Sequence, residues 1–167
     1  TLTGSYWGMI CAHIGIAVCA LGVGLSTAYD AQRDVRMAPG DSAEVSGYQF
    51  DFVSLKQIQG PNFSAYRGEI EVMSGGKVVA TMLPEKRSYR AGGQVMTEAA
   101  IDGKLSRDLY VSLGEPLAGD AWAIRLYVKP FVRCIWLGGL LIGLGGLLAA
   151  FDKRYRRRKP AVTSTVQ

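Results

Sequence analysis

The chain has 167 residues and a formal net charge of +5, with 49% hydrophobic and 20% charged residues. This length accommodates one modest domain plus accessory segments, and no more. There is a single histidine, and the three cysteines form no CxxC pair. Without a CxxC pair, neither a thiol relay nor a zinc site is supported. The lone histidine falls in an apolar run that we expect to lie in a membrane, so we expect no Ser-His-Asp or Cys-His catalytic set.

The first element is an uncharged run, residues 1–29, in which no side chain is charged if His13 is neutral. The run exceeds the roughly 18–20 residues that a helix needs to cross a bilayer. We expect a transmembrane helix from about Tyr6 to Thr27. A secretory signal peptide is the alternative, but the basic N-terminal region of such a peptide is absent. The chain opens on TLTGSYW without methionine, so we expect a C-terminal piece of a longer protein.

The middle segment, residues 30–130, is nearly balanced in charge, with 12 basic and 13 acidic side chains between Asp30 and Lys129. Its first stretch, DAQRDVRMAPGDSAEV, is interpreted as a polar link. Period-two alternation begins at SGYQFDFVSL and returns in FSAYRGEIEVM, KVVATMLPEKRSY (broken at Pro84), MTEAAI, RDLYVSL and WAIRLYV, separated by turn signals such as GPN, SGGK and AGGQ. The pattern predicts a small antiparallel β-domain, sandwich-like or barrel-like.

A second uncharged run, from Cys134 to Phe151, predicts another transmembrane helix over residues 131–151. This helix is rich in glycine, and small residues let helix backbones approach closely in lipid. Gly139 and Gly143 are four residues apart, so we expect them to share a face and to lie against another helix. The partner is either the first span, through Gly15, Gly22 and Gly24, or the rest of a longer protein. The glycines concerned are Gly138, Gly139, Gly143, Gly145 and Gly146.

The tail, residues 152–167, holds most of the net positive charge, in KRYRRRK from Lys153 to Lys159. A nucleic-acid-binding patch is one interpretation, but no aromatic stacking platform accompanies it and no nucleic-acid partner is expected. Basic residues beside a span mark the cytoplasmic side. The tail and the N-terminus are then cytoplasmic, and residues 30–130 face outward, which in a bacterium is the periplasm.

The lone histidine, His13, lies inside the first apolar run, in GMICAHIGIAVCALGVG. An imidazole in hydrocarbon must find a partner or cost several kcal/mol, on the order of 2–7. Three roles are open: an interhelical hydrogen bond, proton or substrate handling in a transporter, and axial ligation of a heme iron. Helical spacing puts Met9 and Ile10 one turn before His13, and Ala17 and Ala20 one and two turns after it. These neighbours permit a flat ring to approach and equally permit a second helix.

Charged residues of the middle segment are either a solvated rim or functional groups. Nothing in the sequence brings the carboxylates together as a catalytic pair, so the segment is interpreted as a binding or scaffolding module. Lys129 and Arg133 flank the outer end of the second helix, where they either anchor it to lipid headgroups or meet a heme propionate. The other charges singled out are Glu85, Lys86, Arg87, Glu98, Asp102, Arg107 and Asp108.

Six segments, in order, resemble the C-terminal end of the cytochrome c maturation protein family CcmF: WGMICAHIGIAV, LPEKRSY, MTEAAI, RDLYVSLGEP, WAIRLYVKPFVRCIWLGGLLIGLGG and DKRYR. The resemblance covers nearly the whole chain. It implies a multi-pass protein of the bacterial inner membrane, the heme lyase subunit of the system I pathway. Such a subunit attaches heme to apocytochrome c in the periplasm.

The resemblance also implies a cofactor and partners. The family holds a heme b between two transmembrane histidines, and His13 matches the second of them by motif position. The implied partners are the heme chaperone CcmE, CcmH-type apocytochrome-handling subunits, apocytochrome c and membrane lipid.

The chain departs from the family pattern in lacking the tryptophan-rich periplasmic signature, the other transmembrane histidine and the two periplasmic heme-ligating histidines. It is therefore expected to be a fragment of a heme lyase that is not catalytic on its own. The alternative is a non-catalytic two-span membrane protein, with a periplasmic β-domain that binds a partner and His13 as a packing residue. The expected fold class is membrane α plus all-β, with two transmembrane helices flanking a small antiparallel β-domain.

Overall fold

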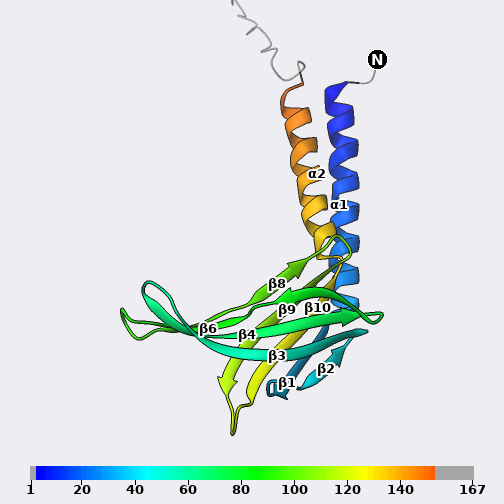
Figure 1. The fold of residues 1–167 in the computed structure, drawn as a ribbon. Helices are drawn as coiled ribbons and strands as arrows, with labels where there is room; N and C mark the ends of the chain where they lie inside the picture. Colours follow the sequence, from blue (N-terminus) through cyan, green and yellow to red (C-terminus); the bar gives the residue numbers. More distant parts are fainter. Residues whose placement is uncertain (1–2, 153–167) are drawn as a thin grey trace, which may run out of the picture. The chain divides into compact units, whose positions relative to one another are not determined.

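The computed structural model describes residues 3–152 (Figure 1). The chain divides into two compact units, which are considered separately. One consists of residues 1–24 and 134–167, the other of residues 25–133. We call them the helical unit and the β-unit.

The β-unit is all-antiparallel, and its described residues form ten strands. The strands are β1 (Ala31–Met37), β2 (Ser42–Val45), β3 (Tyr48–Gln59), β4 (Phe63–Ser74), β5 (Lys77–Met82), β6 (Glu85–Tyr89), β7 (Val95–Glu98), β8 (Ala100–Gly103), β9 (Arg107–Pro116) and β10 (Trp122–Pro130). One sheet has the order β1-β10-β9-β8. The other has the order β2-β3-β4-β6-β7, with β5 also paired to β4. The predicted antiparallel β-domain is confirmed.

Alternate residues of both sheets meet in one apolar core, which makes the unit a sandwich. In β3, for example, Phe50 and Phe52 are buried while Gln49 and Val53 are exposed. Complete burial of a large apolar side chain contributes about 1.5–3 kcal/mol. The core also includes Met37, Val45, Ile70, Val72, Met82, Leu109, Val111, Leu113, Trp122, Ile124, Leu126 and Val128.

The stretch at residues 30–45 is not a link, contrary to the sequence-based interpretation. It forms β1 and β2, and β1 pairs with β10 from Ala31↔Val128 to Met37↔Trp122. β1 is an edge strand with few inward positions, and Met37 is its only fully buried residue. Charged residues on its outer positions hide the period-two pattern, as is common for edge strands.

The break predicted at Pro84 separates β5 from β6. Both strands pair with β4, on either side of Gly68, whose amide donates to the Pro84 carbonyl at 2.9 Å. Proline has no N–H to continue the ladder. The segment MTEAAI, expected to be one strand, is divided between β7 in one sheet and β8 in the other.

The helical unit consists mainly of α1 (Gly4–Ala28) and α2 (Val132–Ala150), both long and apolar enough to cross a membrane. The two helices are antiparallel, because Gly8 meets Gly145 while Gly15 meets Gly138. The Ser5 amide donates to Asp152 Oδ2 at 2.6 Å, and Cys11 Sγ donates to the Leu141 carbonyl at 3.3 Å. The basic residues of the predicted tail lie outside the described residues.

Glycines spaced by seven residues form the seam between α1 and α2. A Cβ placed on Gly15 would lie 2.7 Å from the Ile142 amide nitrogen and 2.8 Å from the Gly138 carbonyl oxygen. The seam consists of Gly8, Gly15 and Gly22 on α1 and Gly138 and Gly145 on α2.

The glycines expected to make the contact between α1 and α2 are only partly right. On α1, Gly15 and Gly22 contribute to the seam as expected. Around a Cβ placed on Gly24, Gly139 or Gly143, however, the described residues leave open space. Gly138 and Gly145 take the contact with α1 instead, and packing of Gly139 and Gly143 against helices outside this chain stays a prediction.

Candidate functional site

His13 lies in the first half of α1 with its imidazole exposed. Its Nδ1 lies 2.8 Å from the backbone carbonyl oxygen of Met9, one turn earlier. Because a carbonyl only accepts, Nδ1 carries the hydrogen in this contact, and in a neutral imidazole that tautomer has an unprotonated Nε2. The orienting hydrogen bond therefore leaves one nitrogen lone pair available.

The imidazole points away from α2. His13 precedes the seam residue Gly15 by two positions, which is about 200° around the helix. Three small exposed residues, Ala17, Ala20 and Gly24, follow on the same side. Among the described residues, the hydrogen bond of His13 is to its own helix and not to a second one.

The His13 site fits a heme iron. Metal-bound imidazoles usually donate their other N–H to a carbonyl or carboxylate, which fixes the ring and its tautomer. The contact with Met9 is of this kind, and the small residues after His13 leave room for a flat macrocycle. A bis-histidine heme site would need a second histidine from outside this chain, whose only histidine is His13.

Other metal-binding and thiol chemistry finds no support in the part of the chain that the structure describes. No group of three or more His, Cys, Asp or Glu side chains gathers in residues 3–152. Cys11, Cys19 and Cys134 are free and partly buried in the helices. Their small, weakly polar side chains pack there as apolar residues do.

Within the β-unit, Glu85 is not part of a solvated rim. Its carboxylate is only 5% exposed and accepts hydrogen bonds from Arg67 Nε at 2.6 Å and from Arg87 Nε at 2.7 Å. Burial alone would raise the pKa of Glu85, but the two arginines outweigh it and hold the pKa below the ordinary value of 4.5. Glu85 thus joins β6 to β4 as a structural ion pair.

Replacing Glu85 with glutamine is expected to destabilise the β-unit by about 2 kcal/mol at neutral pH, because hydrogen bonds to a charged group are lost. The pKa of the folded carboxyl is depressed, so its stabilisation is complete above 4.5 and disappears as the pH falls through the lower, folded value. The gap between wild type and variant should therefore close in acid. Hydrogen exchange at the β4 and β6 amides measures it. The exposed ion pair of Glu115 with Lys86 supplies the control, since Glu115→Gln should change stability by less than about 1 kcal/mol.

The remaining charges singled out from the sequence lie in ion pairs. Lys129 Nζ is 3.7 Å from Asp30, and Arg133 Nε is 3.3 Å from Asp108. Roles at lipid headgroups or at a heme propionate stay open for both cations. The other pairs are Arg87 with Glu98, Lys86 with Glu115 and Arg107 with Asp102.

Arg107 is a buried cation that its sequence context does not reveal. It is 6% exposed, donates to the Asp102 carbonyl oxygen at 3.0 Å and lies 5.3 Å from the ring centroid of Tyr48. The sequence offers no signal for this burial, because the strand begins at Arg107 and an arginine there is ordinarily exposed.

The sandwich and its sequence match a known family. The profile of the CcmF C-terminal beta-sandwich matches residues 28–130. The chain belongs to the CcmF family. Relatives named cytochrome c-type biogenesis protein CcmF are 59% identical in Pseudomonas aeruginosa and 52% identical in Escherichia coli, each over 156 residues and 93% of this chain. The chain corresponds to the C-terminal part of CcmF and spans 24% of the length of these relatives.

A solved structure shares the fold. A chain titled cytochrome c heme lyase CcmF superposes with a TM-score of 0.72 and 19% identity, covering 86% of this chain and 24% of that one. This likeness extends beyond the sandwich, because 86% of the chain is more than residues 28–130, which the family profile matches. CcmF membership and the two apolar helices are consistent with membrane insertion.

Proposed function

We propose that this chain is the C-terminal portion of a heme lyase subunit that attaches heme covalently to apocytochrome c in the periplasm. In this proposal His13 is one axial ligand of a b-type heme within the membrane. The chain is not catalytic on its own, because it supplies one ligand and one β-domain to a larger protein.

The exposed imidazole of His13 carries the proposal. It is polar, it lies on an apolar helix and it points away from α2, the helix that packs against α1 among the described residues. Its Nδ1–H is held by the Met9 carbonyl, so Nε2 is free for a metal. A bound heme would supply one-electron transfer that keeps the heme destined for apocytochrome c reduced. Loss of heme from the His13→Ala variant of the complete protein tests the proposal.

The partners proposed for the complete protein are the heme chaperone CcmE, CcmH-type subunits and apocytochrome c. Residues 30–130 are proposed to be periplasmic, residues 1–29 and 131–151 to span the bacterial inner membrane, and residues 152–167 to be cytoplasmic. The six basic residues between Lys153 and Lys159 support this orientation, since basic flanks remain inside.

The orientation predicts the activity of inserted reporters. A reporter that is active only in the periplasm should be active when inserted between Gly75 and Gly76, in the exposed β4–β5 turn. The same reporter fused after Pro160 should be inactive. Alkaline phosphatase activity normalised to protein amount measures this. The reverse pattern would place the β-unit in the cytoplasm and remove the proposed role.

A further inference from the structure

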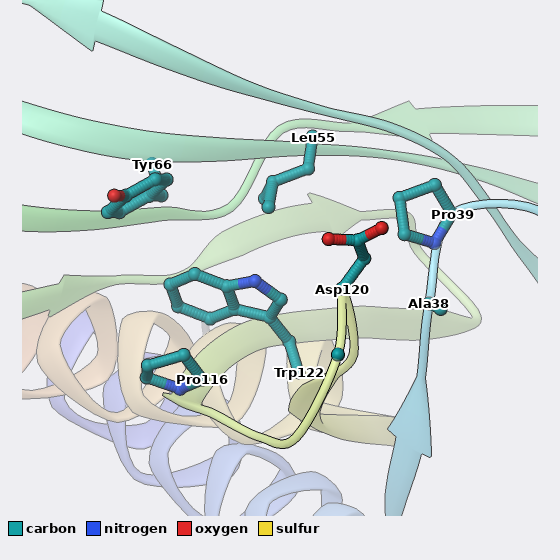
Figure 2. Close-up of a pocket in the computed structure, with 8 residues that line it drawn as sticks. Ala38, Pro39, Leu55, Tyr66, Pro116, Asp120 and Trp122 are labelled. Atoms are coloured by element: carbon teal, nitrogen blue, oxygen red, sulfur yellow. The ribbon is translucent and has the colours of Figure 1, made fainter.

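A cleft of about 510 Å³ opens on the β-unit beside the β9–β10 hairpin (Figure 2). Its aromatic residues come from both sheets, Trp122 from β10 and Tyr66 from β4, with ring centroids 5.2 Å apart. Trp122 is 5% exposed and fixed by the core, whereas Tyr66 is 43% exposed. The cleft therefore combines a rigid indole with an accessible phenol ring.

The rest of the lining is apolar except for one carboxylate. Leu55, Pro39 and Pro116 line the apolar part, and Asp120 is the one charged residue among those that line this cleft. Among the described residues no ion pair or side-chain hydrogen bond engages the Asp120 carboxylate. An unpaired anion beside aromatic faces is suited to a cation, which gains both charge attraction and a cation–π contact.

The indole N–H of Trp122 adds a donor. No described residue accepts from it, and no fully buried side-chain nitrogen or oxygen lacks a partner, so this N–H is reached by solvent. Figure 2 shows the indole nitrogen on the ring edge that faces Leu55 and Asp120. The Trp122 N–H and the Asp120 carboxylate thus open into the same apolar space. The N–H can donate to a peptide carbonyl, and the carboxylate can pair with a basic side chain.

The cleft continues past its aromatic pair into a second hollow. This hollow shares Tyr66, Pro116 and Trp122 with the cleft, and its other lining residues include Gln57, Ser88, Lys86, Arg87 and Glu115. Both cations are already paired, Lys86 with Glu115 and Arg87 with Glu85 and Glu98. An extended chain can occupy two adjoining hollows, whereas a compact small molecule needs one. Aromatic-lined grooves are one recurring means by which proteins recognise extended peptides.

We infer that this cleft binds an extended peptide segment of a protein partner through a Lys or Arg side chain. The charged end pairs with Asp120, the aliphatic stem lies along Leu55 and the prolines, and Trp122 and Tyr66 present their rings to the cation. This inference goes beyond the heme-ligand role of His13, and it does not depend on that role.

The test uses the complete protein in lipid nanodiscs and a short fluorescent peptide of alanine, proline and leucine with one central lysine. Matched peptides carry glutamate or norleucine in its place, and fluorescence anisotropy reports binding. The lysine peptide should bind about tenfold tighter than the glutamate peptide. Asp120→Asn should weaken the lysine peptide about fivefold, and Asp120→Lys should reverse the preference.

The matched control is Glu44→Lys, because Glu44 on β2 is exposed and makes no ion pair among the described residues. It changes the net charge by the same amount and should leave the preference intact. Tyr66→Ala should weaken the lysine peptide about threefold. The His13→Ala variant should bind the lysine peptide normally. A wrong heme assignment would therefore not look like a failure of the peptide-binding inference. Equal binding of the three peptides, or a lysine preference that survives Asp120→Lys, would overturn the inference.

Discussion

Replacing His13 with alanine in the complete protein is expected to remove the b-type heme while the β-unit remains folded. The imidazole is the only histidine side chain that this chain offers to an iron, and alanine has no ligand atom. The substitution opens no cavity between α1 and α2, because His13 points away from the glycine seam. Heme content per protein and the reduced α-band of purified protein measure the outcome, and cytochrome c maturation should fall with them.

The matched control is Leu21→Ala, which removes another large exposed side chain, 64% accessible, from α1. It should keep wild-type heme. His13→Gly adds a readout that separates ligation from packing, because free imidazole in the buffer should restore part of the spectrum only if His13 is a ligand. His13→Met should retain some heme with a shifted reduction potential, since the axial ligand tunes it. Wild-type heme and an unchanged spectrum in His13→Ala would show that His13 is a packing residue.

If His13 holds the proposed heme, its position along α1 predicts an indirect effect on maturation. α1 begins at Gly4, so the imidazole lies about 14 Å along the helix. The whole of α1, to Ala28, is about 37 Å long. In the proposed orientation the first half of α1 is the cytoplasmic half, so His13 would lie too deep to contact a protein that docks on the periplasmic side. It can serve chemistry there only by holding a cofactor that transfers electrons.

Period-two patterning predicts the central strands because their inward and outward neighbours differ in polarity. It fails for β1, an edge strand in which Arg33, Asp34 and Arg36 are all exposed and only Met37 is fully buried. It also fails for the division between β7 and β8, because a chain that passes from one sheet to the other at Ala99 leaves no turn signal. Local sequence does not show which strands pair when they are far apart along the chain.

The candidate site is foreseen only in part for a similar reason. An apolar helix with one histidine identifies His13, but its direction away from α2 depends on which face of α1 pairs with α2. Glu85 looks like a surface charge beside Lys86 and Arg87. Its burial follows from the register of β6 against β4, which opposes Glu85 to Arg67. The residues next to Glu85 in the sequence do not reveal this register.

Replacing Gly15 with leucine is expected to separate α1 from α2. A Cβ at this position would meet backbone, with the Ile142 amide nitrogen at 2.7 Å and the Gly138 carbonyl oxygen at 2.8 Å. A backbone cannot rotate away as a flexible side chain can, so the helices must move apart. Overpacking costs about 1–3 kcal/mol, and helix pairs in lipid depend on close contact. The amount of chain in membranes should fall several-fold, as losses of about 1–2 kcal/mol do.

Gly139→Leu is the matched control. It also replaces a glycine with leucine, but Gly139, next to Gly138 on α2, does not face α1. The described residues leave open space around a Cβ at Gly139 and at Gly143. In the 167-residue chain this variant should accumulate like wild type. In the complete protein, a loss of abundance for Gly139→Leu with Gly143→Leu would place that face against helices outside this chain. Wild-type abundance of Gly15→Leu in both settings would contradict the seam, because a leucine cannot fit between backbones that close.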